Sequence, residues 1–194
     1  MTDKIIANLH YLFEECICTI KKASKGGMSQ QPMTDSWLKV VNFDKMAKIY
    51  SKNIKVSILP SSNDALYICP NEQWFFIEFK DGSIDKAHIY RKIYDSLIIL
   101  IELGIIPDFN FVRDHISYIL VYNSEKLKEQ EAQNRDRIFE YISDLAKDEV
   151  KLFGIEKFEK YLFKKAHTYS KVQFEEKFIN VMEEQENLAI KDSQ

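Results

Sequence analysis

A short aromatic segment of the chain contains two opposite charges at a spacing of two residues. In residues 74–80, the sequence WFFIEFK places Glu78 and Lys80 among apolar side chains. Because side chains two positions apart on a strand leave the same face, both charges must project together, whereas Phe79 projects from the other face. A buried charge without a partner costs on the order of several kcal/mol, so this pair requires a partner, a metal ion or a solvent-filled cleft.

The apolar segment just before it supplies a second carboxylate. The sequence DALYI begins at Asp64, a turn follows at residues 70–73, and Asp81-Gly82 closes the second segment, which together predict a β-hairpin. With the turn centred near Asn71, Asp64 lies opposite Glu78, with Cβ atoms about 5 Å apart, and diagonal to Lys80. Two carboxylates at that separation repel one another unless one is protonated or a divalent cation lies between them.

These three side chains are the parts of a magnesium site for phosphoester chemistry. The carboxylates of Asp64 and Glu78, the carbonyl oxygen of Phe79 and waters would complete the octahedron that Mg²⁺ requires, with Mn²⁺ as the alternative ion. Lys80 would lie beside a water held by the ion, where it helps to orient or deprotonate the nucleophile that attacks a phosphodiester. We therefore predict Asp64, Glu78 and Lys80 as catalytic residues.

The spacing of these residues resembles the motif of the PD-(D/E)xK nuclease superfamily. The pattern is Asp64, thirteen residues, and then the triplet EFK, followed by a predicted helix and strand. That family has the order helix, three-stranded meander, helix, strand, which this sequence fits over residues 4–122. The resemblance implies a restriction-endonuclease-like core, metal ligation by Asp64 and Glu78, Lys80 as the catalytic lysine, and DNA or RNA as substrate. Asn63 replaces the name-giving proline, which alters the turn but removes no ligand.

The helix after the hairpin offers a candidate phosphate-binding surface. Asp85 is placed to cap a helix that runs to Leu103, and Gly104 follows where a left-handed C-cap belongs. Related nucleases use this helix to support the site. Four of its polar residues are candidate substrate-binding residues, at or near one face: His88, Arg91, Lys92 and Ser96. The alternative is that these residues form only the solvated side of the helix.

Periodicity and turn residues predict the remaining elements. They are a helix at 4–22, a loop at 24–36, strands at 37–43, 54–59, 116–122 and 158–163, a short helix at 44–50, a long helix from Ser124, and a final helix after Ser170 with Phe174, Phe178 and Val181 buried. We therefore predict an α/β fold with a mixed β-sheet flanked by α-helices. The expected organisation is one domain over residues 1–185 and a flexible tail at 186–194.

The composition agrees with one folded domain. The chain has 194 residues, of which 45% are hydrophobic and 13% aromatic, which argues against disorder. Cys16, Cys18 and Cys69 show no disulfide or zinc pattern. The formal charge of −3 gives no overall attraction to nucleic acid, so phosphate binding would depend on a local basic patch or a metal ion. No signal peptide or membrane span is expected, which favours a cytoplasmic protein without membrane contact.

Two other interpretations of the hairpin residues stay open. One is a cross-strand salt bridge on a solvated sheet face, which would have a structural role only. The other is a catalytically inactive nuclease fold that acts by binding a partner, as an immunity or phage-defence component would. The expected partners are therefore nucleic acid, another protein, or a second copy of the chain through an exposed aromatic patch.

Overall fold

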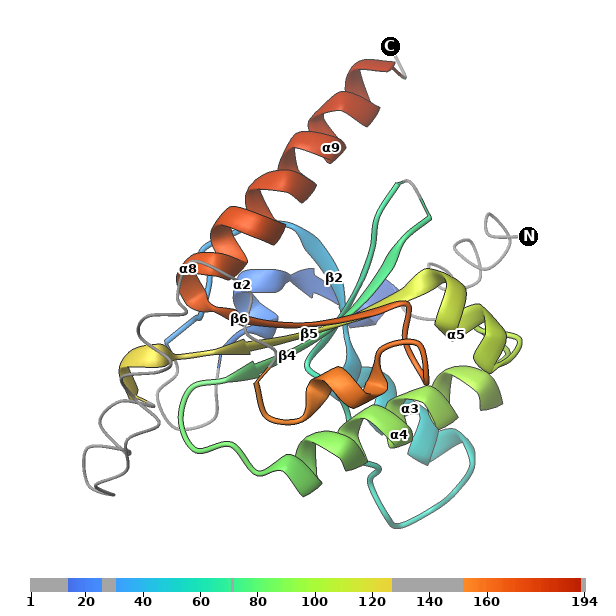
Figure 1. Cartoon of the computed structure of the whole chain (residues 1–194). Helices are drawn as coiled ribbons and strands as arrows, with labels where there is room; N and C mark the ends of the chain where they lie inside the picture. Colours follow the sequence, from blue (N-terminus) through green and yellow to red (C-terminus); the bar gives the residue numbers. More distant parts are fainter. Residues whose placement is uncertain (1–13, 26–30, 71, 127–151, 193–194) are drawn as a thin grey trace, which may run out of the picture.

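The computed structural model of this chain describes residues 14–25, 31–70, 72–126 and 152–192. Its framework is a six-stranded mixed β-sheet with helices on both faces (Figure 1). The strands lie side by side in chain order: β1 (Ile17–Thr19), β2 (Lys39–Asn42), β3 (Ala65–Ile68), β4 (Trp74–Lys80), β5 (Ile116–Tyr122) and β6 (Lys165–Ser170). Neighbours from β1 to β4 pair antiparallel, whereas β4, β5 and β6 pair parallel. The predicted α/β class with a mixed, helix-flanked sheet is confirmed.

Two groups of helices cover the two faces of the sheet. One core contains side chains from α3 (Phe43–Asn53), α4 (Lys86–Glu102), α5 (Phe109–His115) and the 3-10 turn η2 (Ile155–Phe158). The other core contains side chains from α2 (Ile20–Ala23), α8 (Lys171–Phe174), the π-helical turn η3 (Glu175–Ile179) and α9 (Asn180–Asp192). A further 3-10 turn, η1 (Glu14–Cys16), precedes β1.

The central strands are apolar because both of their faces are covered. Every residue of β5 is buried, and β4 is buried from Trp74 to Phe79. Alternate side chains of β4 enter different cores: Phe76 packs on the α4 side, whereas Phe75 and Phe79 pack on the α9 side. Glu78 therefore points to the α4 side, at a position where every other residue of the strand interior is hydrophobic.

The predicted hairpin and its register are confirmed. Ala65 pairs with Ile77, so one further step along the ladder places Asp64 opposite Glu78. The turn is closed by two backbone hydrogen bonds, in which Cys69 N–H donates to Gln73 at 2.8 Å and Glu72 N–H donates to Cys69 at 3.0 Å. The pairing partner of Asp64 is thus set by the turn and by the two-residue period of side chains.

The helix α4 has the boundaries that its capping residues predict. The Asp85 carboxylate accepts hydrogen bonds from Ala87 N–H at 2.9 Å and His88 N–H at 3.3 Å, which satisfies two free donors of the first turn. Gly104, just beyond the C-terminal end, has the left-handed φ of 65° that glycine favours. A buried apolar stripe, Ile89, Ile93, Leu97 and Leu100, docks the helix on the sheet.

Three predicted elements are wrong. Residues 17–19 of the expected first helix form strand β1, because alternate side chains there enter opposite cores; residues 1–13 lie outside the described chain. Residues 54–59 form no strand, because they pair with no other strand in the part of the chain that the structure describes, and Ile58 is 77% exposed. Residues 158–163 contain the last residue of η2 and a turn with Lys160 at a φ of 62°, which is incompatible with an extended strand, and the strand follows at β6.

The C-terminal helix begins as predicted but then changes its buried face. Ser170 and Gln173 form the expected reciprocal capping box, and Phe174 and Phe178 are buried. Val181 is 38% exposed, so its predicted burial is wrong. The π-helical turn η3 adds one residue to the helical turn, so the next buried position is Met182, which is 7% exposed, and not Val181. Residues 186–192 continue α9, and the predicted flexibility of the tail at 186–194 stays a prediction.

Other expectations concern cysteines, membrane spans and the helix after β5. All three cysteines are buried. Within the described ranges, no helix combines the length and apolar character needed to cross a bilayer. Residues 124–126 are helical, and the rest of the long helix predicted from Ser124 lies outside the described chain until residue 152.

Replacing Asp85 with alanine should destabilise the protein, because two amide donors of α4 lose their acceptor. The expected loss in the free energy of unfolding is about 1 kcal/mol, measured by urea unfolding. Asp114→Ala is the matched control, since Asp114 is an exposed carboxylate that lies inside a helix and not at its cap. Equal losses in the two variants would contradict a capping role for Asp85.

Candidate functional site

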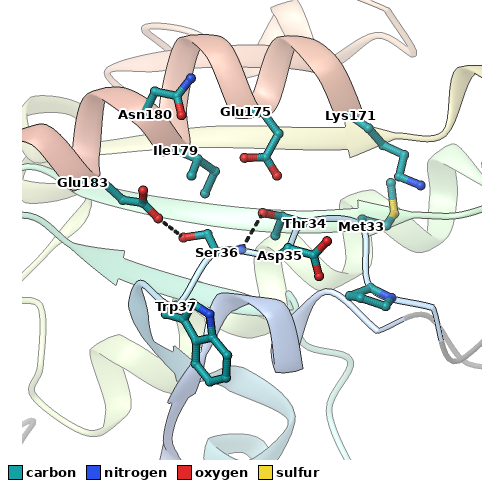
Figure 2. Close-up of a pocket in the computed structure, with 11 residues that line it drawn as sticks. Met33, Thr34, Asp35, Ser36, Trp37, Lys171, Glu175, Ile179, Asn180 and Glu183 are labelled. Carbon is teal, nitrogen blue, oxygen red and sulfur yellow. Dashed lines mark hydrogen bonds between the residues drawn. The ribbon is translucent and has the colours of Figure 1, made fainter.

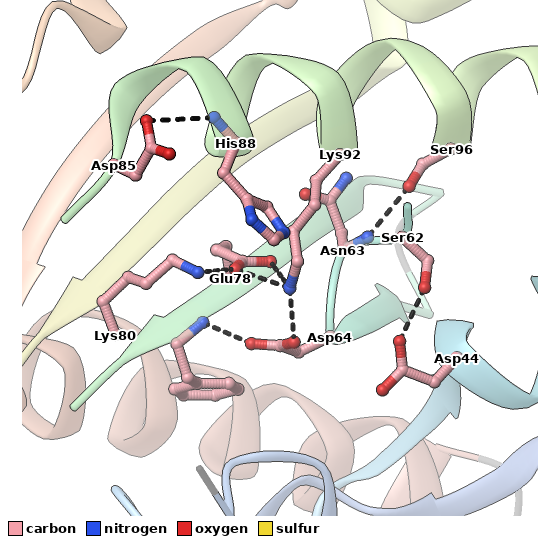
Figure 3. A network of polar contacts seen from close by, with 11 residues as sticks. Asp44, Ser62, Asn63, Asp64, Glu78, Lys80, Asp85, His88, Lys92 and Ser96 are labelled. Atoms are coloured by element: carbon pink, nitrogen blue, oxygen red, sulfur yellow. Dashed lines mark hydrogen bonds and ion pairs between the residues drawn. The ribbon is translucent and has the colours of Figure 1, made fainter. Parts of the chain in front are cut away.

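Four charged side chains meet between the β3–β4 hairpin and helix α4 (Figure 3). Asp64 precedes β3, Glu78 and Lys80 lie on β4, and Lys92 reaches down from α4. We call these four residues the charged cluster. The structure thus brings together all three predicted catalytic residues and one of the predicted substrate-binding residues.

Glu78 is the centre of the charged cluster. Its side chain has no solvent exposure, and it is paired with two ammonium groups. Lys80 Nζ lies 2.8 Å from Glu78 Oε1, and Lys92 Nζ lies 2.7 Å from Oε1 and 3.0 Å from Oε2. The buried carboxylate therefore has the compensation that its place in an apolar strand requires.

Asp64 is held beside Glu78 by two different donors. Its Oδ2 accepts a hydrogen bond of 2.7 Å from the backbone N–H of Phe79, and its Oδ1 lies 3.0 Å from Lys92 Nζ. One ammonium group, that of Lys92, therefore bridges both carboxylates. The aromatic ring of Phe79 leaves the opposite face of the sheet and packs against Phe174 at a centroid distance of 5.6 Å. Metal ligation by the Phe79 carbonyl oxygen stays a prediction.

The electrostatics of the charged cluster follow from burial and proximity. Burial, together with the charge of Glu78, raises the pKa of Asp64 to about 7, although Lys92 and the Phe79 amide act in the opposite direction. Burial disfavours the charge on Lys92, but the two carboxylates outweigh this effect and hold the pKa of Lys92 above its ordinary range. Lys92 is thus a permanent cation between two acids, one of which gains a proton near neutral pH.

The charged cluster is open to solvent on one side. The side chains of Asp64 and Lys80 are each 18% exposed and that of Lys92 is 14% exposed, whereas Glu78 forms the closed floor. His88 lies at the rim, and Figure 3 shows its imidazole directed toward the cluster. Burial and the neighbouring charges of Lys80 and Lys92 lower the pKa of His88, so this imidazole is neutral at pH 7.

The remaining two candidate substrate-binding residues are placed differently. Ser96 is fully buried, and its hydroxyl accepts a hydrogen bond of 2.9 Å from Asn63 N–H, so it holds the segment that leads to Asp64. Arg91 is exposed on α4, and within the described residues no hydrogen bond or ion pair joins it to the charged cluster.

The segment before Asp64 is fastened to the two helices on this face. Ser61 N–H donates to Asp95 on α4 at 2.9 Å, and the Ser62 hydroxyl donates to Asp44 on α3 at 2.6 Å. Together with the contact between Asn63 and Ser96, three consecutive residues are fixed by helical side chains. The position of the Asp64 carboxylate is therefore determined by helix packing as well as by the hairpin.

Two buried polar groups near the charged cluster lack hydrogen-bond partners among the described residues. They are the Asn63 carboxamide, at both its nitrogen and its oxygen, and the Tyr118 hydroxyl. Burial, then the charges of Glu78 and Asp64, raise the pKa of Tyr118, which places its hydroxyl within electrostatic reach of both acids. Leaving such groups unpaired costs about 1–3 kcal/mol each, which is characteristic of sites that take up water or an ion.

Sequence reasoning missed both residues as parts of the site. Asn63 was visible as a neighbour of Asp64, but its complete burial depends on contacts with α4. Tyr118 pairs with Phe76 across the parallel β4–β5 ladder, two positions from Glu78 on the same side of the sheet. Only the long-range register of β4 and β5 reveals that relation.

The carboxylates of Asp64 and Glu78 are the residues of the charged cluster that could hold a divalent cation. Within the described chain, no group of three or more histidine, cysteine, aspartate or glutamate side chains is arranged to hold a metal. Oxygens of Asp64 and Glu78 nevertheless lie 3.0 Å and 2.7 Å from one cationic atom, Lys92 Nζ, so both face one cation-sized position. Two carboxylates with water or a carbonyl oxygen are ligands that Mg²⁺ and Mn²⁺ accept.

A separate pocket of about 550 Å³ lies on the α9 side of the sheet (Figure 2). Residues 32–37 form one wall, and Lys171, Glu175, Ile179, Asn180 and Glu183 form the other. The Ser36 hydroxyl donates to Glu183 at 2.6 Å across it. None of the predicted site residues lines this pocket, and the sheet separates it from the charged cluster.

Replacing Asp64 with asparagine should change how stability depends on pH in buffer without divalent ions. The folded chain keeps the Asp64 proton up to about pH 7, whereas the ordinary value is 3.8. Between these values the folded state binds more protons, so the contribution of Asp64 to the free energy of unfolding decreases as pH rises, by at most about 1.4 kcal/mol per unit.

Urea unfolding at pH 4.5, 5.5 and 6.5 measures this effect. The difference in unfolding free energy, wild type minus Asp64→Asn, should decrease across the series, and Asp114→Asn controls for the loss of one surface carboxylate. A difference that is constant with pH would contradict the raised pKa.

Comparison of the chain with protein-family models, curated proteins and solved structures found no match. A functional interpretation therefore depends on the geometry of the charged cluster and on the strand order around it.

Proposed function

We propose that this chain is a metal-dependent nuclease with a restriction-endonuclease-like core of the PD-(D/E)xK type, which hydrolyses phosphodiester bonds in DNA or RNA with Mg²⁺ or Mn²⁺. The observation that supports this proposal is the convergence of two carboxylates and a lysine on one solvent-reachable side of the β3–β4 hairpin.

The strand order also supports the proposal. Strands β2, β3 and β4 pair antiparallel in sequence, α4 follows, and β5 returns parallel to β4. This is the order of meander, helix and strand that the resemblance implies. The acidic residues lie at the β3–β4 pair, beside the crossover helix, as that arrangement requires.

Each residue of the charged cluster has a role in this proposal. Asp64 and Glu78 would hold the divalent ion, with the Phe79 carbonyl oxygen as a further ligand; the bound ion would offset negative charge that develops on the phosphate. Lys80 Nζ, 2.8 Å from Glu78, would orient the attacking water and hold or release its proton. For this role, Lys80 has to lie beside the two acids, because the position between them is the one that the divalent ion would occupy.

The substrate would approach from the open side of the charged cluster. The neutral imidazole of His88 can donate a hydrogen bond to a phosphate oxygen, and exposed Arg91 on the same helix can add positive charge. The net charge of the chain is −3, so affinity for a polyanion would come from this local group of basic residues.

A second candidate is an inactive nuclease fold that acts by binding a protein partner or another copy of the chain, as in immunity or phage defence. One observation favours it: Lys80 and Lys92 already balance the charges of Asp64 and Glu78 without any metal ion. A complete ion-pair network can serve as structure alone. The two candidates differ in whether the chain binds a divalent ion and cleaves nucleic acid.

Incubation of the purified chain with single- and double-stranded DNA and RNA tests the proposal. Cleavage should require Mg²⁺ or Mn²⁺ and should stop on chelation. Lys80→Ala and Glu78→Ala should each lower the cleavage rate by about 100-fold or more, because each removes a group that acts on the reaction or its ion. Lys48→Ala, at an exposed position of α3, should cleave at the wild-type rate.

Circular dichroism of each variant distinguishes lost chemistry from lost folding. Equal cleavage by the wild type, Lys80→Ala and Glu78→Ala would assign the activity to a contaminant and contradict the proposal. Absence of cleavage in the wild type, with no binding of Mn²⁺, would favour the partner-binding candidate.

A further inference from the structure

The Lys92 ammonium lies at the position where a divalent ion would contact both acids. It is within 3.0 Å of oxygens from Asp64 and Glu78, and Figure 3 shows it reaching down from α4 between the two carboxylates. Lys80, in contrast, forms an ion pair with Glu78 and none with Asp64 among the residues that the structure describes. The two lysines of the charged cluster therefore have different relations to the candidate metal site.

Charge balance makes the Lys92 ammonium and a divalent ion alternatives. The charged cluster contains two carboxylates and two ammonium groups, so its formal charge is already neutral. Adding a doubly charged ion while Lys92 stays in place would bring like charges together in a site whose floor, Glu78, has no solvent exposure. Repulsion at that separation in a poorly screened environment is costly.

Both lysines of the charged cluster are partly exposed. The Lys92 side chain is 14% exposed and that of Lys80 is 18% exposed, so both border solvent, whereas Glu78 has no exposure. Lys80 shares strand β4 with Glu78, whereas Lys92 comes from α4 and lies between the two acids. The Asn63 oxygen, a buried acceptor without a partner in the described chain, lies under the same turns of α4, where its backbone amide bonds Ser96.

We infer that Lys92 is a tethered counter-cation that occupies the divalent-ion site in the metal-free chain and leaves it when the ion binds. This inference rests on the proposed metal site and adds its regulation: the ion must displace Lys92, so Lys92 sets the concentration of Mg²⁺ or Mn²⁺ at which the site fills. The displaced ammonium remains at the mouth of the site, near His88, on the side from which a phosphate would approach.

Titration of Mn²⁺ into Lys92→Met, followed by calorimetry, tests this inference directly. Methionine keeps the length of the apolar stem and removes the charge. The variant should bind Mn²⁺ about tenfold more tightly than the wild type or better, because no ammonium has to be displaced. Lys86→Met, an exposed lysine of the same helix, is the matched control and should bind like the wild type.

Thermal unfolding gives a second measurement that does not depend on activity. Lys92→Met leaves two facing carboxylates without their bridging cation, so its unfolding midpoint should lie below that of the wild type and should rise more steeply with Mn²⁺. Lys92→Arg keeps the positive charge and should not gain affinity for Mn²⁺.

A measurement on the wild type covers the case in which Lys92→Met fails to fold. The chain is labelled with ¹³C at lysine Cε and titrated with diamagnetic Mg²⁺; the Lys92 signal, assigned by its absence in Lys92→Arg, should move as the site fills. A Lys92 signal that stays fixed at saturating Mg²⁺ would overturn the inference.

The calorimetric outcomes separate this inference from the proposed function. Binding by Lys92→Met that equals or falls below wild-type binding would overturn the role of Lys92 and leave the metal site standing. Binding by Lys92→Met alone would support the role of Lys92, and it would show that the wild-type chain excludes the ion. Absence of Mn²⁺ binding in both proteins would overturn the metal site and this inference together.

Discussion

The buried carboxylate of Glu78 has to be compensated, and that requirement determines the arrangement around the hairpin. Strand β4 is covered on both faces and the Glu78 side chain has no solvent exposure, so neighbouring cations compensate its charge. Lys80 comes from the same strand, whereas Lys92 comes from α4 and depends on the docking of that helix. On this side of the sheet, the packing of α4 and the charge compensation of Glu78 therefore depend on each other.

The local part of the site follows from the sequence. A tight turn and the two-residue period of strands suffice to place Asp64 opposite Glu78, and Asp85 and Gly104 suffice to bound α4. The helical spacing of His88 and Lys92 identifies their common face. That spacing does not show that the Lys92 ammonium lies between Asp64 and Glu78, because this position depends on how α4 crosses the sheet.

The errors in the predicted fold have a common origin in short apolar segments. Three residues at β1 satisfy helical and extended spacing equally well, and only pairing with β2 decides between them. The β-branched run at 54–59 has strand character but no pairing partner. The π-helical turn at Glu175–Ile179 shifts the buried face of α9, an effect that a regular helical period cannot represent.

The parallel pairing of β4 with β5 has a consequence for the order in which the molecule folds. The β3–β4 hairpin needs only contacts close in sequence, whereas β5 and the docked α4 need a long crossover, which forms more slowly. A nascent hairpin would therefore hold Asp64 and Glu78 opposite one another before Lys92 arrives. Repulsion between the two carboxylates would destabilise that early hairpin, and the docking of α4 with Lys92 would then stabilise it. Hairpin formation and helix docking would therefore be coupled steps of folding.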